Sequence, residues 1–194
     1  MKILMALAVV AATAGGAQAA TVFSDDFSGY GPNTVLSAPN AVFAPNWTAL
    51  SGTVDYLASG SAYGNLCNTG TNCVDLDGST GQGGVFATVK SFAAGTYKLS
   101  VAIFGNRRGA GDDIVTIVLG SFSKQLDLSS WEDGSAIFKF TTTGGQLSFA
   151  NGGGDNQGAI LQGVELAAVP VPAAAPLLAG GIGALVALRK RRKA

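Results

Sequence analysis

The chain has 194 residues, in which 12 lysines and arginines balance 12 aspartates and glutamates, and it contains no histidine. A Ser-His-Asp triad is therefore excluded, and the most common zinc ligand is absent. Residues 21–168 hold six basic residues against all twelve acidic ones, a net charge of −6. A body this acidic argues against nucleic-acid binding, which needs clustered Lys and Arg.

The first 20 residues have the plan of a secretory signal peptide. Lys2 supplies the positive start, residues 3–14 are apolar, and Ala17-Gln18-Ala19 is a small-x-small cleavage site. We expect the mature chain to begin near Ala20 and to leave the cytoplasm. The alternative is a buried N-terminal helix of the mature fold.

Residues 21–168 have the pattern of one β-rich domain, at a length that suits a single core. Apolar and polar residues alternate with period two in segments 97–103, 122–128, 136–140 and 147–149. Segment 114–119 is apolar on both faces, as in a central strand, and segment 159–167 completes the set. Gly-Gly, Asp-Gly and Asn-Gly pairs between them favour turns. We expect an all-β fold, a β-sandwich of the jelly-roll kind.

Cys67 and Cys73 flank a five-residue gap and are the two cysteines of the chain. In an exported protein, two nearby cysteines most often form a disulfide. A redox pair or a metal site is the minor alternative, because two thiolates alone leave zinc under-coordinated.

Acidic residues gather at several places where oxygen atoms could hold a metal ion or act in catalysis. Asp75 and Asp77 lie two apart on an expected strand, so both carboxylates would face the same side, within the range of paired glycosidase carboxylates. Turn acids and calcium ligands are the more common uses of such a pair. Asp25, Asp26 and Glu165 are candidates for a structural calcium between the terminal strands, although no calcium-loop spacing is present.

Aromatic faces, amides and guanidinium groups are the side chains suited to contact with a sugar. The candidates are Tyr56, Tyr63, Asn106, Arg107 and Trp131, together with Trp47, for which a core position is the favoured alternative. Trp131 stands in a polar segment between strands and is expected to be exposed. Arg107 and Arg108 either pair with Asp112 and Asp113 or contact an acidic polysaccharide.

The C-terminal segment 169–194 has the composition of a membrane-inserted tail. Residues 169–188 carry no charge, and a helix free of internal proline is expected over 176–188. That helix would span about 20 Å, against ~30 Å for the hydrocarbon core. The basic run Arg189, Lys190, Arg191, Arg192 and Lys193 predicts a cytoplasmic C-terminus. A permanent single-pass anchor is the alternative to a transient hold.

This tail resembles the VPLPA-CTERM sorting signal of the PEP-CTERM group of Gram-negative bacteria. The motif reads Val169-Pro170-Val171-Pro172-Ala173, with Val171 where the family usually has Leu, and the resemblance covers the last 26 residues. It implies recognition by an exosortase-type membrane protease, which would release or re-attach the body at the cell surface or in the extracellular matrix.

The body is similar to secreted proteins with galactose-binding-like jelly rolls, including the DUF642-like group. The similarity lies in Trp47-Thr48, in segments 54–57, 73–79 and 95–100, and in Asn151-Gly152-Gly153-Gly154-Asp155-Asn156. Such proteins usually close with Leu-Asp-Asn-Val, where this chain has Leu161-Gln162-Gly163-Val164. The resemblance implies a carbohydrate-binding or cell-surface module rather than a catalyst.

Together these features predict an exported, non-enzymatic β-sandwich that binds extracellular polysaccharide and needs no cofactor beyond a structural calcium. A purely structural or adhesive surface protein is the second hypothesis, and a glycan-active enzyme is the third.

Overall fold

The computed structural model describes residues 18–31, 43, 45–61, 63–68, 70–79, 82–109, 113–130 and 134–170. Four sequence predictions lie outside these residues: most of the signal peptide, Trp131, the end of the sorting motif from Val171, and the C-terminal helix with its basic run. Among the helices that are described, none has the length and hydrophobicity needed to span a membrane.

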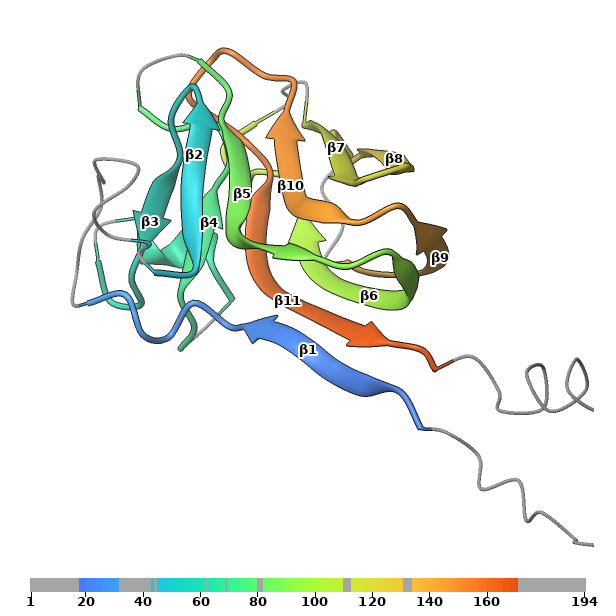
Figure 1. Cartoon of the computed structure of the whole chain (residues 1–194). Coiled ribbons are helices and arrows are strands. Elements are labelled where there is room, and N and C mark those ends of the chain that lie inside the picture. The colour runs from blue at the N-terminus through green and yellow to red at the C-terminus, as the bar shows by residue number, and fades with distance from the viewer. Residues whose placement is uncertain are drawn as a thin grey trace, which may run out of the picture. The chain divides into compact units, whose positions relative to one another are not determined.

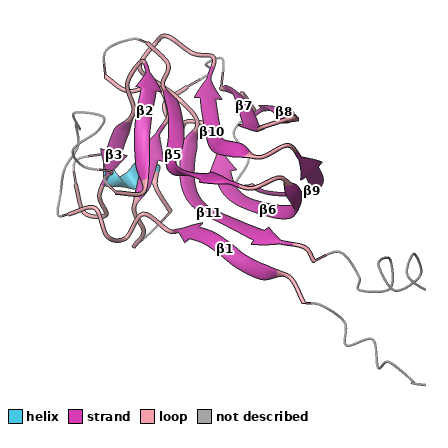
Figure 2. Cartoon of the chain, viewed as in Figure 1, coloured by secondary structure: helices cyan, strands magenta, loops and turns pink. Residues whose placement is uncertain are grey.

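The folded body, Ala19–Val169, consists of two antiparallel β-sheets. The first sheet contains β1 (Ala20–Asp25), β3 (Asp55–Leu57), β4 (Cys73–Asp75), β6 (Gly95–Phe104), β9 (Ser135–Thr142) and β11 (Ile160–Ala168). The second contains β2 (Trp47–Ser51), β5 (Val85–Phe92), β7 (Ile114–Leu119), β8 (Phe122–Asp127) and β10 (Gly145–Asn151). One helical turn, η1 (Gly64–Leu66), lies close to β3, and strands make up nearly all other regular structure in view (Figure 2). The predicted all-β sandwich is confirmed.

The strand orders are β3-β4-β11-β6-β9 in the first sheet and β2-β5-β10-β7-β8 in the second. Along one edge, β11 changes its partner: Ile160 and Leu161 pair with β4, whereas Val164 to Ala168 pair with β1. The register of β11 against β6 shifts between Leu161 and Gly163. Gly163 therefore lies at the irregular point between two successive partner strands.

The core lies between the sheets and is rich in aromatic rings. Trp47 is 1% exposed, stacks on Phe86 with ring centroids 4.6 Å apart, and donates its indole N–H to Asp25 Oδ2 over 2.8 Å. Leu99 and Val101 of β6 contribute from the first sheet. The core alternative for Trp47 is thus confirmed, and its ring offers no face to a sugar.

Strand β7 differs from its prediction on one face. Val115, Ile117 and Leu119 are fully buried, as expected, but the alternate residues Ile114, Thr116 and Val118 are half-buried. Each sheet of a sandwich has one face toward the core, so even a central strand has an outer face that is partly exposed to solvent.

Both ends of the body lie at the same corner. Ala20 pairs with Ala168, so β1 begins where β11 ends, and Figure 1 shows the two strands side by side. The segments that precede and follow the body therefore start from neighbouring points.

Candidate functional site

A groove of about 840 Å³ lies on the outer face of the first sheet. We call it the outer groove. Its floor comes from Ser100 and Ala102 of β6, Ser135 of β9 and Gly163 of β11. In the register, Ala102 pairs with both Ser135 and Gly163, so three small residues stand in one row across three strands. Because none of them has a long side chain, the sheet surface is hollow at this row.

The neighbouring row across the same strands carries two larger side chains, Glu165 and Ile137, on either side of Ser100. Ser100 pairs with Glu165 of β11 and with Ile137 of β9, and Glu165 pairs with Ser24 of β1. Ile137 is 62% exposed, so it presents an apolar surface beside the hollow. The outer groove therefore combines hydroxyls, a carboxylate and an aliphatic face.

One end of the outer groove is fixed by the carboxylate of Asp25. Its Oδ1 accepts the backbone N–H of Phe27 over 2.8 Å, and its Oδ2 accepts the hydroxyl of Tyr30, the Asn46 amide at 3.2 Å and the Trp47 indole N–H. Burial and the neighbouring carboxylate raise the pKa of Tyr30, which keeps its hydroxyl protonated as a donor. This network holds Tyr30 and Asn46 as a rigid wall.

The three carboxylates predicted to bind calcium all line the outer groove, where each accepts hydrogen bonds from protein donors. Asp26 Oδ1 accepts the backbone N–H and the hydroxyl of Ser28, and Glu165 Oε1 accepts the Thr21 hydroxyl over 2.8 Å. With Asp25 committed to four donors, the described residues contain no group of three or more acidic or cysteine side chains placed to hold a metal ion. Each of the three carboxylates instead closes a local turn or accepts from its own partner, and the calcium assignment stays a prediction.

The groove lining holds Asp25, Asp26 and Glu165 and, among the described residues, neither lysine nor arginine. The Ser28 donors lower the pKa of Asp26, so its carboxylate stays ionised. The outer groove is thus a negatively charged surface at neutral pH.

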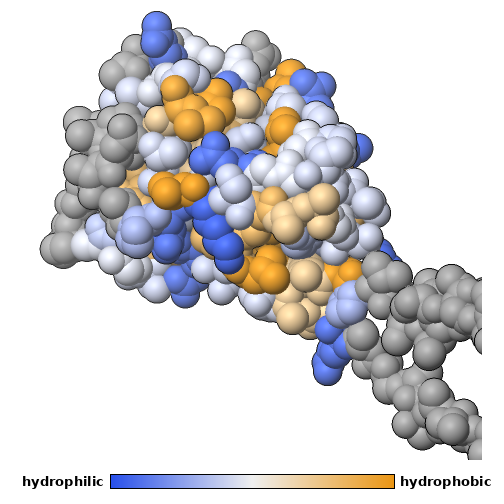
Figure 3. Space-filling view, in the orientation of Figure 1, coloured by the Kyte–Doolittle hydropathy of each residue, from blue (hydrophilic) through white to orange (hydrophobic). Residues whose placement is uncertain are grey.

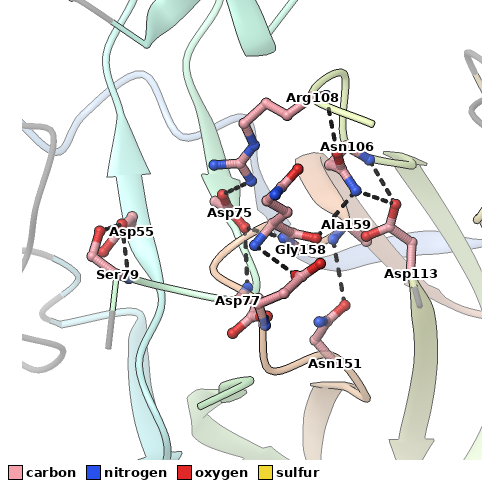
Figure 4. A network of polar contacts seen from close by, with 12 residues as sticks. Asp55, Asp75, Asp77, Ser79, Asn106, Arg108, Asp113, Asn151, Gly158 and Ala159 are labelled. Carbon is pink, nitrogen blue, oxygen red and sulfur yellow. Dashed lines mark hydrogen bonds and ion pairs between the residues drawn. The ribbon is translucent and has the colours of Figure 1, made fainter. Parts of the chain in front are cut away.

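A second polar region lies under the loops at the other end of the sheet (Figure 4). Asp75 Oδ1 accepts the backbone N–H groups of Asp77 and Gly158, both at 3.0 Å, and its Oδ2 pairs with the Arg108 guanidinium. Asp113 Oδ2 accepts the backbone and side-chain N–H groups of Asn106 at 2.9 and 2.7 Å. These buried groups tie the loops after β4, β6 and β10 to one another.

Burial raises the pKa values of the carboxyls in this network. For Asp75 desolvation is the largest effect, and it outweighs Arg108 and the backbone donors, so the pKa rises to about 7. The pKa values of Asp55, Asp77 and Asp113 are raised in the same direction, also mainly by burial. Asp77 Oδ1 and Asp113 Oδ1 are buried and have no hydrogen-bond partner among the described residues. Protonation of these oxygens would remove an unpaired buried charge.

Two predicted ligand contacts are wrong because their side chains are buried. Tyr56 is fully buried between the sheets, where its hydroxyl donates to the Phe27 carbonyl over 3.0 Å. Asn106 is 2% exposed, and its amide is bound to Asp113 and to the Gln157 carbonyl. Both are polar groups that fasten the fold.

The remaining predicted contacts that the structure describes do not line the outer groove. Arg107 donates to Asn68 Oδ1 over 2.8 Å and lies 5.0 Å from the Phe104 ring centroid. Arg108 pairs with Asp75 rather than with the predicted Asp113. Tyr63 is 51% exposed and lines a separate small pocket.

Asp75 and Asp77 do not share a strand as predicted. Strand β4 ends at Asp75, and Asp77 follows it, with its Oδ2 accepting the Asp155 backbone N–H over 3.1 Å. The disulfide between Cys67 and Cys73, in contrast, is confirmed, with Cα atoms 5.6 Å apart.

Sequence reasoning missed the floor of the outer groove. Ser100 and Ala102 occupy the polar positions of an alternating strand, a pattern that marked the outer face but not a site on it. Gly163 was noted only as a departure from a family motif. Small residues on three separate strands indicate a groove only once the register of the strands places them side by side.

The sequence matches no protein-family model and no curated protein. Solved structures do match in part. An exo-β-1,3-galactanase of Phanerochaete chrysosporium is 18% identical over 59% of this chain and 26% of that chain, with a TM-score of 0.38. The CBM22-1-GH10 modules of a Clostridium thermocellum endo-1,4-β-D-xylanase are 16% identical over 78% and 29% of the chains, with a TM-score of 0.45.

A cellulose-binding domain of Cellulomonas fimi β-1,4-glucanase C, the second from the N-terminus, is 17% identical over 73% of this chain and 95% of that one, with a TM-score of 0.36. This chain spans 26% and 29% of the galactanase and xylanase chains, so it is similar to only part of each. All three TM-scores are below 0.5, and the matches by themselves assign no function.

Proposed function

We propose that the body binds an extracellular polysaccharide in the outer groove. The observation that carries this proposal is the row of Ser135, Ala102 and Gly163, which leaves a hollow of about 840 Å³ across three strands. A hollow that crosses strands and is open to solvent admits an extended polymer, whereas an enclosed cavity would admit only a small molecule.

The chemistry of the lining suits a polyhydroxylated chain. Ionised carboxylate oxygens of Asp26 and Glu165 accept hydrogen bonds from sugar hydroxyls, and such charge-assisted bonds are the stronger kind. The hydroxyls of Ser100 and Ser135 both donate and accept. Ile137 and the half-buried Tyr30 offer apolar surfaces on which the C–H faces of sugar rings can pack.

The variant Gly163→Leu tests this site by filling the hollow. A Cβ at Gly163 would lie 3.8 Å from Ala102 Cβ, an ordinary contact, so the backbone tolerates a side chain. We expect at least a tenfold loss of affinity, about 1.4 kcal/mol, in affinity electrophoresis on gels containing soluble polysaccharides. Ser123→Leu, on the exposed surface of β8, is the matched control and should migrate as the parent does.

Two other outcomes decide against the proposal. Equal retardation of Gly163→Leu and the parent would place binding elsewhere. A folded parent that binds no polysaccharide in a broad panel would favour the structural or adhesive surface protein instead.

We also propose that binding is not accompanied by catalysis. The chain has no histidine, and Asp75 and Asp77, the pair with glycosidase-like spacing in the sequence, are each bound to backbone N–H groups. Incubation with each bound polysaccharide should release no new reducing ends. Their appearance, together with loss of the release in Asp75→Asn, would establish a glycan-active enzyme.

Export and sorting form the third part of the proposal. The disulfide between Cys67 and Cys73 supports export, because such bonds persist in oxidising compartments. We propose that the tail from Val169 is a sorting signal cut by an exosortase-type protease. The intact mass of the protein from its native cells should then show a C-terminus near Pro170 to Ala173, whereas a full-length C-terminus in the membrane fraction would indicate a permanent anchor.

We assign the sandwich to the jelly-roll class. The supporting observation is that β4, β6, β9 and β11 belong to the first sheet, while β5, β7, β8 and β10 belong to the second. An experimental structure with a different strand order would contradict this assignment.

A further inference from the structure

A second cavity of about 240 Å³ lies at the outer side of β3 and β4, and it shares no lining residue with the outer groove. We call it the Tyr63 pocket. In the register, Asp55 of β3 stands directly opposite Asp75 of β4. Alternation along β3 sends Tyr56 into the core and places Asp55 and Leu57 on the pocket side.

The residues just before the disulfide-closed loop Cys67–Cys73 supply the opposite wall of the Tyr63 pocket. Leu66, just before Cys67, is buried beside Leu57 in a small apolar cluster. Tyr63 precedes Leu66 in the chain and is 51% exposed, so its ring faces solvent at the pocket edge. The pocket therefore has an apolar floor and an accessible aromatic side chain.

Several polar groups of the Tyr63 pocket have hydrogen-bond donors or acceptors that are available to a ligand. Asp55 Oδ2 accepts the backbone N–H of Ser79 at 3.1 Å and its hydroxyl at 2.5 Å, while Asp55 Oδ1 has no donor within the described part of the chain. Arg108 uses Nη2 on Asp75, and its side chain is 27% exposed, so Nε and Nη1 remain as donors. The side-chain amide of Asn156 makes no hydrogen bond to any residue that the structure describes and also lines the pocket.

This combination selects the kind of molecule that fits. The carboxylate oxygen accepts hydrogen bonds, and the guanidinium and the amide donate them. Neighbouring hydroxyl groups of a ligand match this set, because each hydroxyl both donates and accepts. Asp55 and Asp75 face a single guanidinium, so the pocket has no surplus positive charge to attract an anion. The volume is below the 300–1,000 Å³ typical of sites for drug-sized ligands, so the ligand is small.

We propose that the Tyr63 pocket binds one neutral pyranose residue, with its hydroxyls on Asp55, Arg108 and Asn156 and its apolar face on Leu57, Leu66 and Tyr63. This site is separate from the outer groove and does not depend on polysaccharide binding there. It takes a single sugar residue, as at the end of a chain, where the outer groove takes a stretch of polymer.

The experiment uses saturation-transfer difference NMR on the full-length chain in mild detergent. The probes are the methyl glycosides of glucose, galactose and mannose, with methyl glucuronide as the anionic comparison. We expect at least one neutral glycoside to receive saturation, and to do so more strongly than methyl glucuronide. Tyr63→Ala and Asn156→Gly should each weaken its affinity about tenfold.

Both variants are chosen to preserve the fold. Tyr63 is exposed, and Asn156 has a φ of 64°, a conformation that glycine adopts readily. Tyr63→Phe keeps the ring and should retain most of the affinity. Circular dichroism and thermal unfolding check that each variant remains folded.

The matched control is Gly163→Leu, which fills the outer groove and should leave glycoside binding unchanged. Conversely, Tyr63→Ala should leave polysaccharide retardation unchanged, so the two sites can fail separately. The proposal is overturned if no neutral glycoside receives saturation, if methyl glucuronide binds more tightly, or if transfer persists in both pocket variants. Loss of transfer in Gly163→Leu would assign the glycoside to the outer groove.

Discussion

At the scale of single residues, the buried carboxylates of this protein act as ties between loops. Asp75 holds the backbone N–H groups of Asp77 and Gly158 and the Arg108 guanidinium, and Asp113 holds Asn106. Burial destabilises the ionised form of these carboxyl groups by more than their hydrogen-bond and charge partners stabilise it, as the raised pKa values indicate. The residues fix the shape of the loops at a cost in stability.

The first prediction concerns the dependence of stability on pH. Asp75 has a folded pKa of about 7, above the ordinary value of 3.8, so between these values the folded state keeps a proton that the unfolded state has lost. Stability therefore falls as pH rises from about 4 to 7, by an amount on the order of 4 kcal/mol if Asp75 acts alone. Asp55, Asp77 and Asp113 act in the same direction.

Urea denaturation across this pH range measures the effect. Asp75→Asn removes the titrating group and should flatten the curve. Asp127→Asn, at an exposed position where the Ser129 donors lower the pKa, is the control and should not flatten the curve. Stability that rises from pH 4 to 7 in the parent would contradict the prediction.

The second prediction concerns Gly158, whose backbone N–H is bound to Asp75. A Cβ at this position would lie 2.7 Å from Asp75 Oδ1 and 2.6 Å from Asp77 Cβ, closer than real Cβ atoms approach. Gly158→Ala should therefore destabilise the fold by about 2–4 kcal/mol, measured by urea denaturation. Gly29→Ala, which meets no atom within 4 Å, should change stability little. Equal stabilities of the two variants would show that the loop shifts freely.

At the scale of elements, the two disulfide-bonded cysteines and the residue before them cover one end of the first sheet. Leu66, Cys67 and Cys73 pack with Leu57 of β3 and Phe104 of β6 in a small cluster on the outer face. The other end of this face stays open as the outer groove. One sheet surface is thus divided between a covered part, which forms the Tyr63 pocket, and an exposed part.

The third prediction is that opening the disulfide affects the two parts unequally. Replacing Cys67 and Cys73 with alanine removes the closure of a short loop, a loss of about 2 kcal/mol in the chain-entropy model. The loosened segment should weaken glycoside binding at the Tyr63 pocket but leave polysaccharide retardation unchanged. Urea denaturation and the two binding assays measure these effects. An equal loss in both assays would show that the segment supports the whole sheet.

The longer strands after residue 95 could be predicted from sequence, because each has one face toward solvent and one face toward the core. In β6, Leu99 and Val101 alternate with Ser100 and Ala102, and this period is visible without any partner strand. The three-residue strands β3 and β4 are too short to show a period, so the sequence alone does not reveal that Asp77 lies beyond the strand or that Tyr56 is buried. The outer groove could not be predicted, because its floor depends on the register of β6, β9 and β11.

At the scale of the whole body, both ends leave one corner and the surface in view is mixed. Ala20 and Ala168 are paired, so the first strand of the body begins beside the end of the last one. On the face shown in Figure 3, hydrophobic groups form separate small patches between hydrophilic ones. On the coloured part of this face, therefore, no continuous apolar patch like that of an obligate protein interface is seen.

The last prediction is that the charge of the body selects the polymer. Residues 21–168 carry a net charge of −6, and the outer groove adds Asp26 and Glu165 close to any bound chain. Exposed charges interact over about 10 Å at 0.1 M salt, so an acidic polysaccharide is repelled at low ionic strength, whereas a neutral one is not. A neutral glucan should therefore be retained equally at low and high salt, and polygalacturonate should bind weakly and gain affinity as salt is added. Removing the groove charges with Asp26→Asn and Glu165→Gln should reduce this discrimination. Tight binding of polygalacturonate that salt disrupts would contradict the prediction and direct attention to Arg107 and Arg108.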